Sequence, residues 1–218
     1  MTRDSSEADV PIRVDFRDEA TAREWIETTR IRRPYRPRFF AAFCAALAQH
    51  SKLRILELGS GPGQLAREIL AHCDVETYVA LDFSPAMHAI AAEHLGEHAS
   101  HVQFVIRDFR EAAWPDSLGM FDAVVTMQAA HETRHKRHLI PLLERARRRL
   151  APGGAVLYAD HYLTPETTHP ALMPERGDQP RPGARRLRRG RAGLRRRPDG
   201  AVARPRALTI TPPASTAA

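Results

Sequence analysis

The chain of 218 residues is long enough for one sizeable domain, and its 43% hydrophobic and 27% charged residues are ordinary for a soluble globular protein. The polar N-terminus does not resemble a signal peptide, and no apolar run approaches the roughly 18 residues that a membrane span needs. The net charge of +7 comes from the C-terminal part, because residues 174–218 hold 12 Arg and three acidic residues. We therefore expect a cytoplasmic protein with a slightly acidic core and no membrane partner.

The hydrophobic pattern predicts helices that alternate with strands. Helices are expected over 18–31, 38–49, 64–72, 84–98 and 138–150, and strands over 53–58, 76–82, 102–108, 121–128 and 155–163. A Pro-Gly-Gly turn at 152–154 is expected between the last helix and the last strand. This alternation predicts an α/β fold with an open parallel sheet, in which ligands bind beyond the carboxyl ends of the strands.

Residues 131–135 read HETRH and fit the H-E-x-x-H pattern of zinc peptidases. That pattern needs an α-helix that places both histidines on one face, and a third ligand. Here the motif follows a predicted strand, and Arg134 would crowd a metal ion with positive charge. We therefore expect no metal site, and we expect His131 to lie at the carboxyl edge of the sheet.

The first strand ends in a glycine-rich turn, with Glu57 followed by Gly59, Gly61 and Gly63. Glycines let a backbone turn tightly and approach a ligand closely. The nicotinamide pattern G-x-G-x-x-G would need glycine at 64, where the chain has glutamine. Asp82 ends the second strand, where a carboxylate can accept hydrogen bonds from two ribose hydroxyls.

At this point the chain resembles the class I S-adenosylmethionine-dependent methyltransferases. The resemblance covers residues 50–163, in the stretches ILELGSGPG, ALDFSPAM, FVIRDF, FDAVVTMQAAHE and LLERARRRLAPGGAVLYAD. It implies a Rossmann-like open parallel sheet, the cofactor S-adenosyl-L-methionine, and methyl transfer to an O, N or C atom of a small-molecule acceptor. Members usually add an antiparallel hairpin after the fifth strand, whereas here the pattern fades after about residue 165. We therefore expect strands 6 and 7 of the family to be missing.

The resemblance also assigns roles to residues. Glu57 and the Gly59–Gly63 turn would hold the methionine part of the cofactor, and Gln128 would lie under it. Asp82 would bind the ribose and Phe83 would lie against the adenine. Asp108 and the backbone of Phe109 would contact the adenine edge.

The acceptor side is less clear from the sequence. Tyr35 and Arg36 are candidates for binding the acceptor, because small-molecule members of the family place a helical lid before the first strand. His131 follows the fourth strand and His161 the fifth, so either could act as general base or contact the substrate.

The sequence divides into four regions: a disordered N-terminus (1–14), a helical lid (15–50), the cofactor-binding core (51–165) and a low-complexity tail (166–218). The tail is rich in Arg, Pro, Ala and Gly. It could be a nucleic-acid-binding extension, a merely disordered extension or a translated frameshift of a GC-rich gene, which we favour. Nucleic acid is not the partner we expect. The alternatives to a small-molecule methyltransferase are an RNA-binding or RNA-modifying protein that uses the tail, and a cofactor-binding but inactive truncated enzyme.

Overall fold

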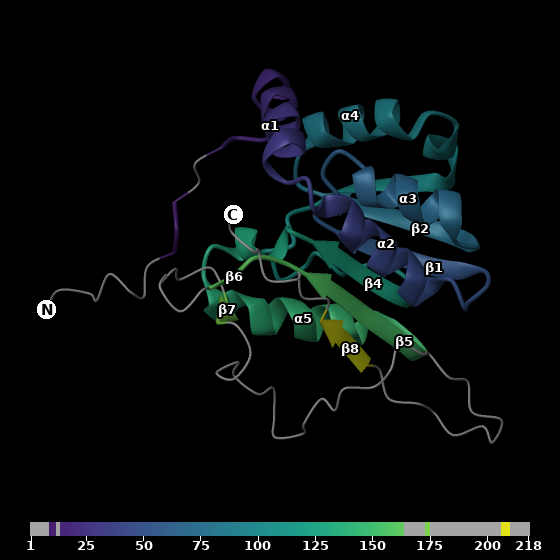
Figure 1. The fold of residues 1–218 in the computed structure, drawn as a ribbon. Helices are drawn as coiled ribbons and strands as arrows, with labels where there is room; N and C mark the ends of the chain where they lie inside the picture. The colour runs from purple at the N-terminus through teal and green to yellow at the C-terminus, as the bar shows by residue number, and fades with distance from the viewer. Residues whose placement is uncertain (1–8, 12–13, 164–172, 175–205, 210–218) are drawn as a thin grey trace, which may run out of the picture.

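The computed structural model describes residues 9–11, 14–163, 173–174 and 206–209 (Figure 1). The α-helices of this part of the chain are α1 (Glu19–Arg32), α2 (Arg36–Leu47), α3 (Gln64–His72), α4 (Pro85–Leu95) and α5 (Leu139–Arg148). The strands are β1 (Leu53–Leu58), β2 (Val75–Asp82), β3 (Val102–Ile106), β4 (Phe121–Met127), β5 (Leu150–Ala159), β6 (Tyr162–Leu163), β7 (Met173–Pro174) and β8 (Arg206–Thr209). Short 3-10 helices are η2 (Gly96–His101), η3 (Ala130–Thr133) and η4 (Lys136–His138).

The main sheet has the strand order β3-β2-β1-β4-β5-β8, and its neighbouring strands are parallel. The chain moves outward from β1 to β2 and β3, and then returns to the other side of β1 to form β4 and β5. The strand order therefore reverses between β1 and β4, which is where sheets of this kind bind ligands beyond their carboxyl ends. The predicted α/β fold with an open parallel sheet is confirmed.

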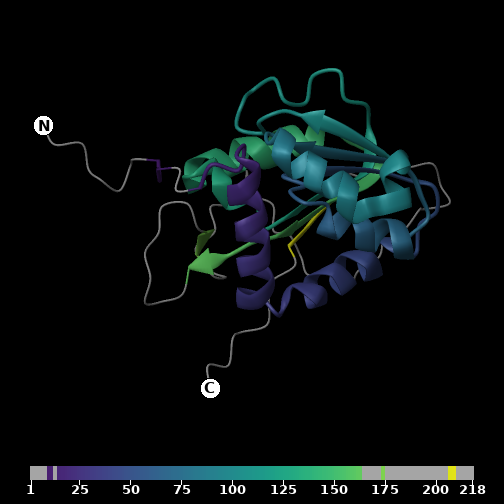
Figure 2. The same cartoon turned by 90° about the horizontal axis from the view of Figure 1, so that it is seen from above.

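Both faces of this sheet are covered. Ile55 of β1 lies in the core beneath α2 and α3, together with Phe43 and Leu65. The next residue, Leu56, points to the opposite face and packs beneath α5 with Leu142. Figure 2 shows α2 and α5 on opposite sides of the sheet. Because the strands are buried on both faces, they appear in the sequence as nearly continuous apolar runs.

The two N-terminal helices form where the sequence predicted them. The side chain of Asp18 caps α1 by accepting a hydrogen bond from the backbone nitrogen of Thr21 at 2.8 Å. α2 begins two residues earlier than predicted, because Pro37 fits the first turn of a helix. α1 packs against α4, and α2 packs against α3. None of the helices in the described part of the chain is long and apolar enough to cross a bilayer.

The predicted turn at 152–154 is wrong, because these residues lie inside β5. The register with β4 jumps from Phe121–Leu150 to Ala123–Ala155, so the Pro-Gly-Gly stretch forms a bulge within the strand. A Cβ on Gly154 would lie 3.0 Å from three backbone oxygens. Glycine therefore lets this bulge pack closely against the neighbouring backbone.

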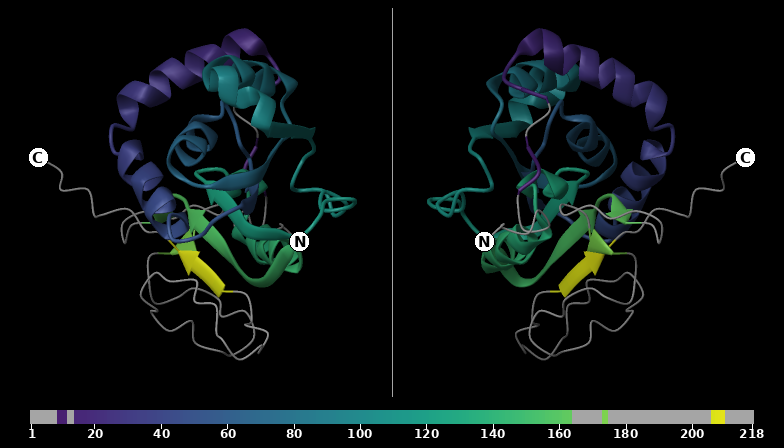
Figure 3. Two further views of the ribbon diagram at one scale, coloured as in Figure 1. Left: turned by 90° about the vertical axis from the view of Figure 1, so that its right-hand side faces the viewer. Right: turned by 90° about the vertical axis from the view of Figure 1, so that its left-hand side faces the viewer.

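β8 lies in parallel beside β5 and covers its edge along Ala155–Tyr158 (Figure 3). This strand was not predicted, because the sequence around it carries no strand pattern. The strand pairs that β6, β7 and β8 form are parallel, so the antiparallel hairpin usual in the resembled family is not formed by the described residues. Most of the predicted tail (166–218) and of the N-terminus (1–14) lies outside the described residues, and the four-region division stays a prediction.

Candidate active site

The turn after β1 uses its three glycines in different ways. Gly59, Gly61 and Gly63 all have left-handed backbones, with φ of +68°, +51° and +74°. A Cβ on Gly59 would lie 2.4 Å from the Cβ of Ala129, and a Cβ on Gly63 would lie 3.0 Å from the Cβ of Ala91. A Cβ on Gly61 would meet nothing within 4 Å. Gly59 thus brings the β1 turn against the β4 turn, Gly63 lets α3 pack on α4, and Gly61 leaves open space above the turn.

Asp82 ends β2 and reaches across to the glycine turn. Its Oδ2 accepts a hydrogen bond from the nitrogen of Gly61 at 2.8 Å, and its Oδ1 accepts one from the nitrogen of Ser84 at 3.0 Å. Burial raises the pKa of Asp82, and the backbone hydrogen bonds oppose that rise. Each carboxylate oxygen can still accept another hydrogen bond, as binding two ribose hydroxyls requires.

Glu57 is buried behind the glycine turn. Its Oε2 accepts a hydrogen bond from the Tyr78 hydroxyl at 2.7 Å. Burial raises the pKa of Glu57 to about 8, against the opposing effects of Tyr78 and Arg36. Arg36 is half-buried and donates to Oε1 of Gln64 at 2.8 Å, but its Nε has no hydrogen-bond partner among the described residues. A buried carboxylate near a guanidinium with a spare donor suits a ligand that carries both an amine and a carboxylate.

Gln128 joins the end of β4 to the turn between α1 and α2. Its Nε2 donates to the Tyr35 hydroxyl at 3.3 Å, and its Oε1 accepts from Arg33 at 3.4 Å. Its backbone is left-handed, with φ of +53°, which costs a residue other than glycine roughly 1 kcal/mol or more. A hydrogen bond from its backbone nitrogen to the oxygen of Ala159, at 2.7 Å, holds this conformation.

Asp108 follows β3 and pairs with Arg110. The backbone nitrogen and the Nε of Arg110 donate to the carboxylate at 2.8 to 2.9 Å, and its terminal nitrogen also contacts it closely. Burial alone would raise the pKa of Asp108, but Arg110 outweighs this and lowers it. The Phe109 side chain packs inward instead, against the place where Gly59 lacks a Cβ. Because Arg110 already binds the Asp108 carboxylate, an adenine amino group would have to compete with Arg110 for it.

A cavity of about 130 Å³ lies beyond the carboxyl ends of β1, β2 and β4. Many residues that the sequence singled out line it: Gly59, Gly61, Asp82, Phe83, Asp108, Phe109, Gln128 and His131. The segment before α1 covers one side, where the oxygen of Phe16 accepts a hydrogen bond from Ser84. The guanidinium carbon of Arg17 lies 4.8 Å from the centroid of the Phe83 ring. Arg17 thus contacts the Phe83 ring, which the resemblance places against the adenine of the cofactor.

His131 is held between two carboxylates. Its Nδ1 lies 2.7 Å from Oδ1 of Asp160, and its backbone nitrogen donates to Oδ2 of the same carboxylate at 2.9 Å. Its Nε2 lies 3.4 Å from Oε1 of Glu132, which also lines the cavity. Burial alone would lower the pKa of His131, but the two carboxylates outweigh it and raise the pKa to about 10. The contact with buried Asp160 keeps the proton on Nδ1 and directs Nε2 toward Glu132.

The second predicted catalytic histidine, His161, stands beside His131 but does not line the cavity. The two ring centroids are 5.3 Å apart. Burial lowers the pKa of His161 to about 4, and its Nε2 is buried without a hydrogen-bond partner in the described part of the chain. A neutral imidazole that does not face the cavity suits a packing role beside His131.

The HETRH stretch is not an α-helix. His131 belongs to the 3-10 helix η3, Arg134 has a left-handed backbone with φ of +64°, and His135 is extended. The ring of His135 instead lies near that of His138, with centroids 6.3 Å apart. The two histidines of the motif therefore do not share a helix face, as the zinc pattern requires. The described residues hold no group of three or more His, Cys, Asp or Glu that could bind a metal ion.

Residues 55–154 match the family described as the methyltransferase domain. This stretch is similar to methyltransferase domains and makes up just under half of the chain. Over 124 residues the chain is 30% identical to 3-methylorcinaldehyde synthase of Talaromyces stipitatus, an alignment that covers 55% of this chain and 4% of the synthase. The resemblance stated from the sequence is confirmed for this domain.

Solved structures share the fold of the domain. A protein of Methanococcus maripaludis assigned as an S-adenosylmethionine-dependent methyltransferase superposes with a TM-score of 0.55, at 19% identity, over 70% of this chain and 68% of its own. The N-methyltransferase NodS of Bradyrhizobium japonicum, in complex with S-adenosylhomocysteine, superposes with a TM-score of 0.50, at 17% identity. That match covers 57% of this chain and 61% of NodS. The chain thus spans less than two thirds of NodS and a small part of the synthase.

The methyltransferase domain offers groups that fit the parts of S-adenosylmethionine. Asp82 retains acceptor capacity for the ribose, and the space above Gly61 lets a ligand reach the backbone. The unused buried Nε of Arg36 suits the carboxylate of the methionine part, and Glu57 suits its amine. Phe83 presents a ring face that Arg17 now contacts.

Sequence reasoning missed several groups of this site. Asp160 comes directly after β5, so the carboxyl-end rule that singled out Asp82 could also have found it. Arg17 and Phe16 precede the first helix in a stretch without periodicity, and no sequence signal places them over the cavity. Five of the residues that the sequence did single out lie outside the cavity wall: Tyr35, Arg36, Glu57, Gly63 and His161.

Proposed function

We propose that this chain transfers the methyl group of S-adenosyl-L-methionine to an O, N or C atom of a small-molecule acceptor, and that His131 removes the proton from that atom. The observation that carries the proposal is the pairing of His131 with buried Asp160 in the wall of the cavity. When bound, the cofactor supplies a methyl group already activated on a sulfonium. The tasks left to the protein are binding, alignment and proton removal.

Residues around the glycine turn would hold the cofactor. Asp82 would accept from the ribose hydroxyls, while the Gly59–Gly63 turn, Glu57 and Arg36 would bind the methionine part. This assigns Arg36 to the cofactor and not to the acceptor, because it donates to Gln64 and lies close to Glu57. Other residues with cofactor roles are Phe83 and Asp108 at the adenine, with the Phe109 backbone, and Gln128 near the methionine part.

His131 is placed to act as a general base. Asp160 accepts from Nδ1 and from the backbone nitrogen, so it fixes both the tautomer and the ring orientation. The acceptor atom would form its bond to the methyl carbon as the carbon–sulfur bond breaks, and the electron pair of that bond would remain on sulfur. Nε2 of His131 would take the proton that the acceptor loses.

Glu132 controls whether this base is available. With both carboxylates ionised, the pKa of His131 is about 10, so the imidazole carries a proton at neutral pH. A nearby cationic sulfonium lowers the pKa of an imidazole, and so does displacement of Glu132 by an acceptor. Glu132 is about half exposed, which leaves its side chain room to swing away. The base would thus become neutral only when both substrates are present.

The acceptor class follows from the same geometry. A base of this kind serves a phenol, or a carbon whose proton is acidified by neighbouring carbonyl groups. The name of the synthase that is 30% identical, 3-methylorcinaldehyde synthase, denotes a methylated aromatic aldehyde product. We therefore favour a phenolic or enolisable small molecule in the cytoplasm as acceptor. The RNA alternative depends on residues 174–218, of which the structure describes 174 and 206–209.

The test is the release of S-adenosylhomocysteine with orcinaldehyde, pentane-2,4-dione or benzylamine as acceptor. His131→Gln should lower kcat by about 10²- to 10⁴-fold while cofactor affinity changes little. His161→Gln should change kcat far less, and His72→Gln, at an exposed position on α3, should leave it unchanged. A wild-type rate in His131→Gln would remove the base from the mechanism. Cofactor binding without turnover on any of these acceptors would support the inactive alternative.

A further inference from the structure

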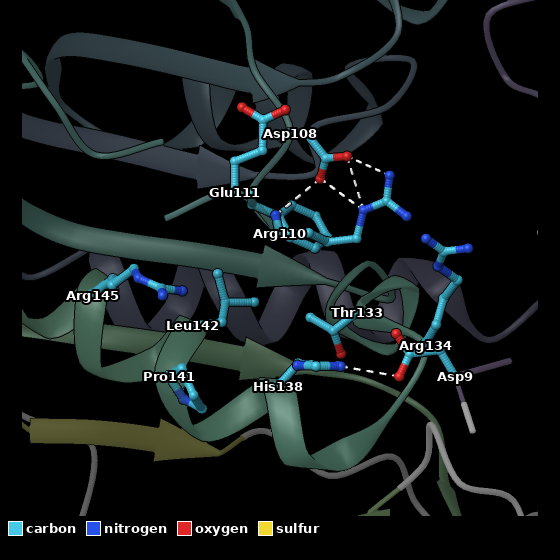
Figure 4. A pocket seen from close by; sticks show the side chains of 11 residues that line it. Asp9, Asp108, Arg110, Glu111, Thr133, Arg134, His138, Pro141, Leu142 and Arg145 are labelled. Atoms are coloured by element: carbon cyan, nitrogen blue, oxygen red, sulfur yellow. Dashed lines mark hydrogen bonds and ion pairs between the residues drawn. The ribbon is translucent and has the colours of Figure 1, made fainter. Parts of the chain in front are cut away.

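We propose that the domain has a second binding site, for a small carboxylate with an apolar body, in the pocket between the β3–β4 connection and α5. This pocket has a volume of about 480 Å³, within the roughly 300–1,000 Å³ of typical small-molecule sites. Figure 4 shows its lining: Asp9, Asp108, Phe109, Arg110, Glu111, Thr133, Arg134, His138, Pro141, Leu142 and Arg145.

Two arginines of this pocket form no ion pair among the described residues. Arg134 follows η3, and its buried Nε lacks a hydrogen-bond partner in the described part of the chain. The side chain of Arg145, on α5, takes part in no hydrogen bond or ion pair among the described residues. In Figure 4 the Arg134 side chain extends toward Arg110. Arg134 and Arg110 thus approach each other at one end of the pocket, whereas Arg145 lies at the other end. A carboxylate bound beside Arg134 would offset the repulsion between the two neighbouring guanidinium groups.

Two of the three acidic side chains of the pocket, Asp108 and Asp9, already have basic partners, and the third, Glu111, points away from Arg134 in Figure 4. Asp108 is already paired with Arg110. The Oδ1 atom of Asp9 lies 2.6 Å from a terminal guanidinium nitrogen of Arg137 and 3.0 Å from Nε2 of His138. Burial opposes ionisation of Asp9, but His138, Arg137 and Arg134 together lower its pKa. This contact shows that the basic residues after η3 accept a carboxylate.

Apolar side chains form another part of the wall. Pro141 and Leu142 lie on α5, one turn before Arg145, and Phe109 comes from the β3–β4 connection. A ligand whose carboxylate reaches Arg134 would place an apolar body against these side chains. An aromatic or branched aliphatic carboxylate meets both requirements, whereas inorganic phosphate meets only the first.

The stretch 108–110 separates this pocket from the cofactor cavity, because Asp108, Phe109 and Arg110 line both. A carboxylate that draws Arg110 toward the second pocket would weaken its hold on Asp108. Asp108 would then be free to accept from the adenine amino group. The second site would therefore raise the affinity for the cofactor, and the cofactor would raise the affinity for the carboxylate to the same extent.

Calorimetry of the full chain with benzoate, without cofactor, tests the site itself. Benzoate should bind, and benzamide, which has the same shape without the charge, should bind at least about tenfold more weakly. Arg134→Gln should weaken benzoate binding, whereas Arg148→Gln, at an exposed position on α5, should not. Equal affinities for benzoate and benzamide, or no binding of either, would overturn the proposal. Because no cofactor is present, this result does not depend on the methyltransferase function.

Discussion

Replacing Gly59 by alanine should destabilise the fold far more than the same change at Gly61. Both residues have a left-handed backbone, which costs alanine about 1–2 kcal/mol. At Gly59 the new Cβ would also lie 2.4 Å from the Cβ of Ala129 and 3.2 Å from the ring of Phe109. A Cβ is fixed to its backbone and cannot rotate away, so the two turns must separate, as in an overpacked core that costs about 1–3 kcal/mol.

The two costs together make Gly59→Ala less stable by about 3 kcal/mol, and Gly61→Ala by about 1 kcal/mol because its Cβ meets nothing within 4 Å. In a chain of this size each kcal/mol lowers the Tm by roughly 2–4 °C. Thermal unfolding without cofactor should therefore show a fall of roughly 6–12 °C for Gly59→Ala and roughly 2–4 °C for Gly61→Ala.

The order should reverse for ligand binding by protein that remains folded, because the Cβ at Gly61 would enter the space above the turn. Gly61→Ala should weaken S-adenosylhomocysteine binding by about tenfold, equivalent to about 1.4 kcal/mol. Equal Tm values for the two variants would refute the close contact between the β1 and β4 turns. Unchanged affinity in Gly61→Ala would refute the placement of the ligand above this turn.

Three further changes test the charges of the site. Glu132→Gln removes one of the anions that raise the pKa of His131, so the rise of kcat/KM with pH should move to lower pH. Each unit by which the pKa of His131 falls should raise kcat/KM at pH 7 about tenfold. An unmoved pH profile would exclude this coupling. Arg17→Ala should bind S-adenosylhomocysteine several-fold more tightly by calorimetry, because the Arg17 side chain contacts the Phe83 ring against which the adenine would lie. Weaker binding would mean that Arg17 itself holds the ligand. Burial holds the pKa of Glu57 above its ordinary value, so in the cofactor-free chain stability should fall as the pH rises from about 4.5 to about 8. Denaturant titrations at several pH values should show a smaller fall in Glu57→Gln, and parallel curves would contradict the buried position of this carboxylate.

The sequence predicted the core of the fold because its strands are buried on both faces and each is followed by a turn or helix signal. Ile55 and Leu56 point to opposite layers, yet both must be apolar, and that pattern is visible without any structure. β8 carries no such pattern, since its pairing depends on β5, a partner about 50 residues away in the sequence. The bulge at 152–154 was read as a turn because glycine and proline mark both features.

The same distinction applies to the site. Glycine positions and the carboxylate of Asp82 could be predicted, because their roles depend on one strand end and its turn. Pairings between segments far apart in the chain could not be predicted. Asp160 on His131 and Arg17 on Phe83 join such segments, while the pairing of Arg110 with Asp108, two residues away, depends on the conformation of a single loop. In the proposed mechanism these pairings would set the charge of His131 and the access to the adenine region, so the proposed chemistry depends on contacts that the sequence does not show.

The most direct test of the account is calorimetric titration of S-adenosylhomocysteine into the purified full chain and into its Asp82→Asn variant. Asparagine keeps the shape and one acceptor oxygen but removes the charge and the second acceptor. The account predicts that one molecule binds per wild-type chain and that the variant binds at least about tenfold more weakly while its circular dichroism is unchanged. A folded wild-type chain that binds no S-adenosylhomocysteine, or equal binding by the two proteins, would contradict it.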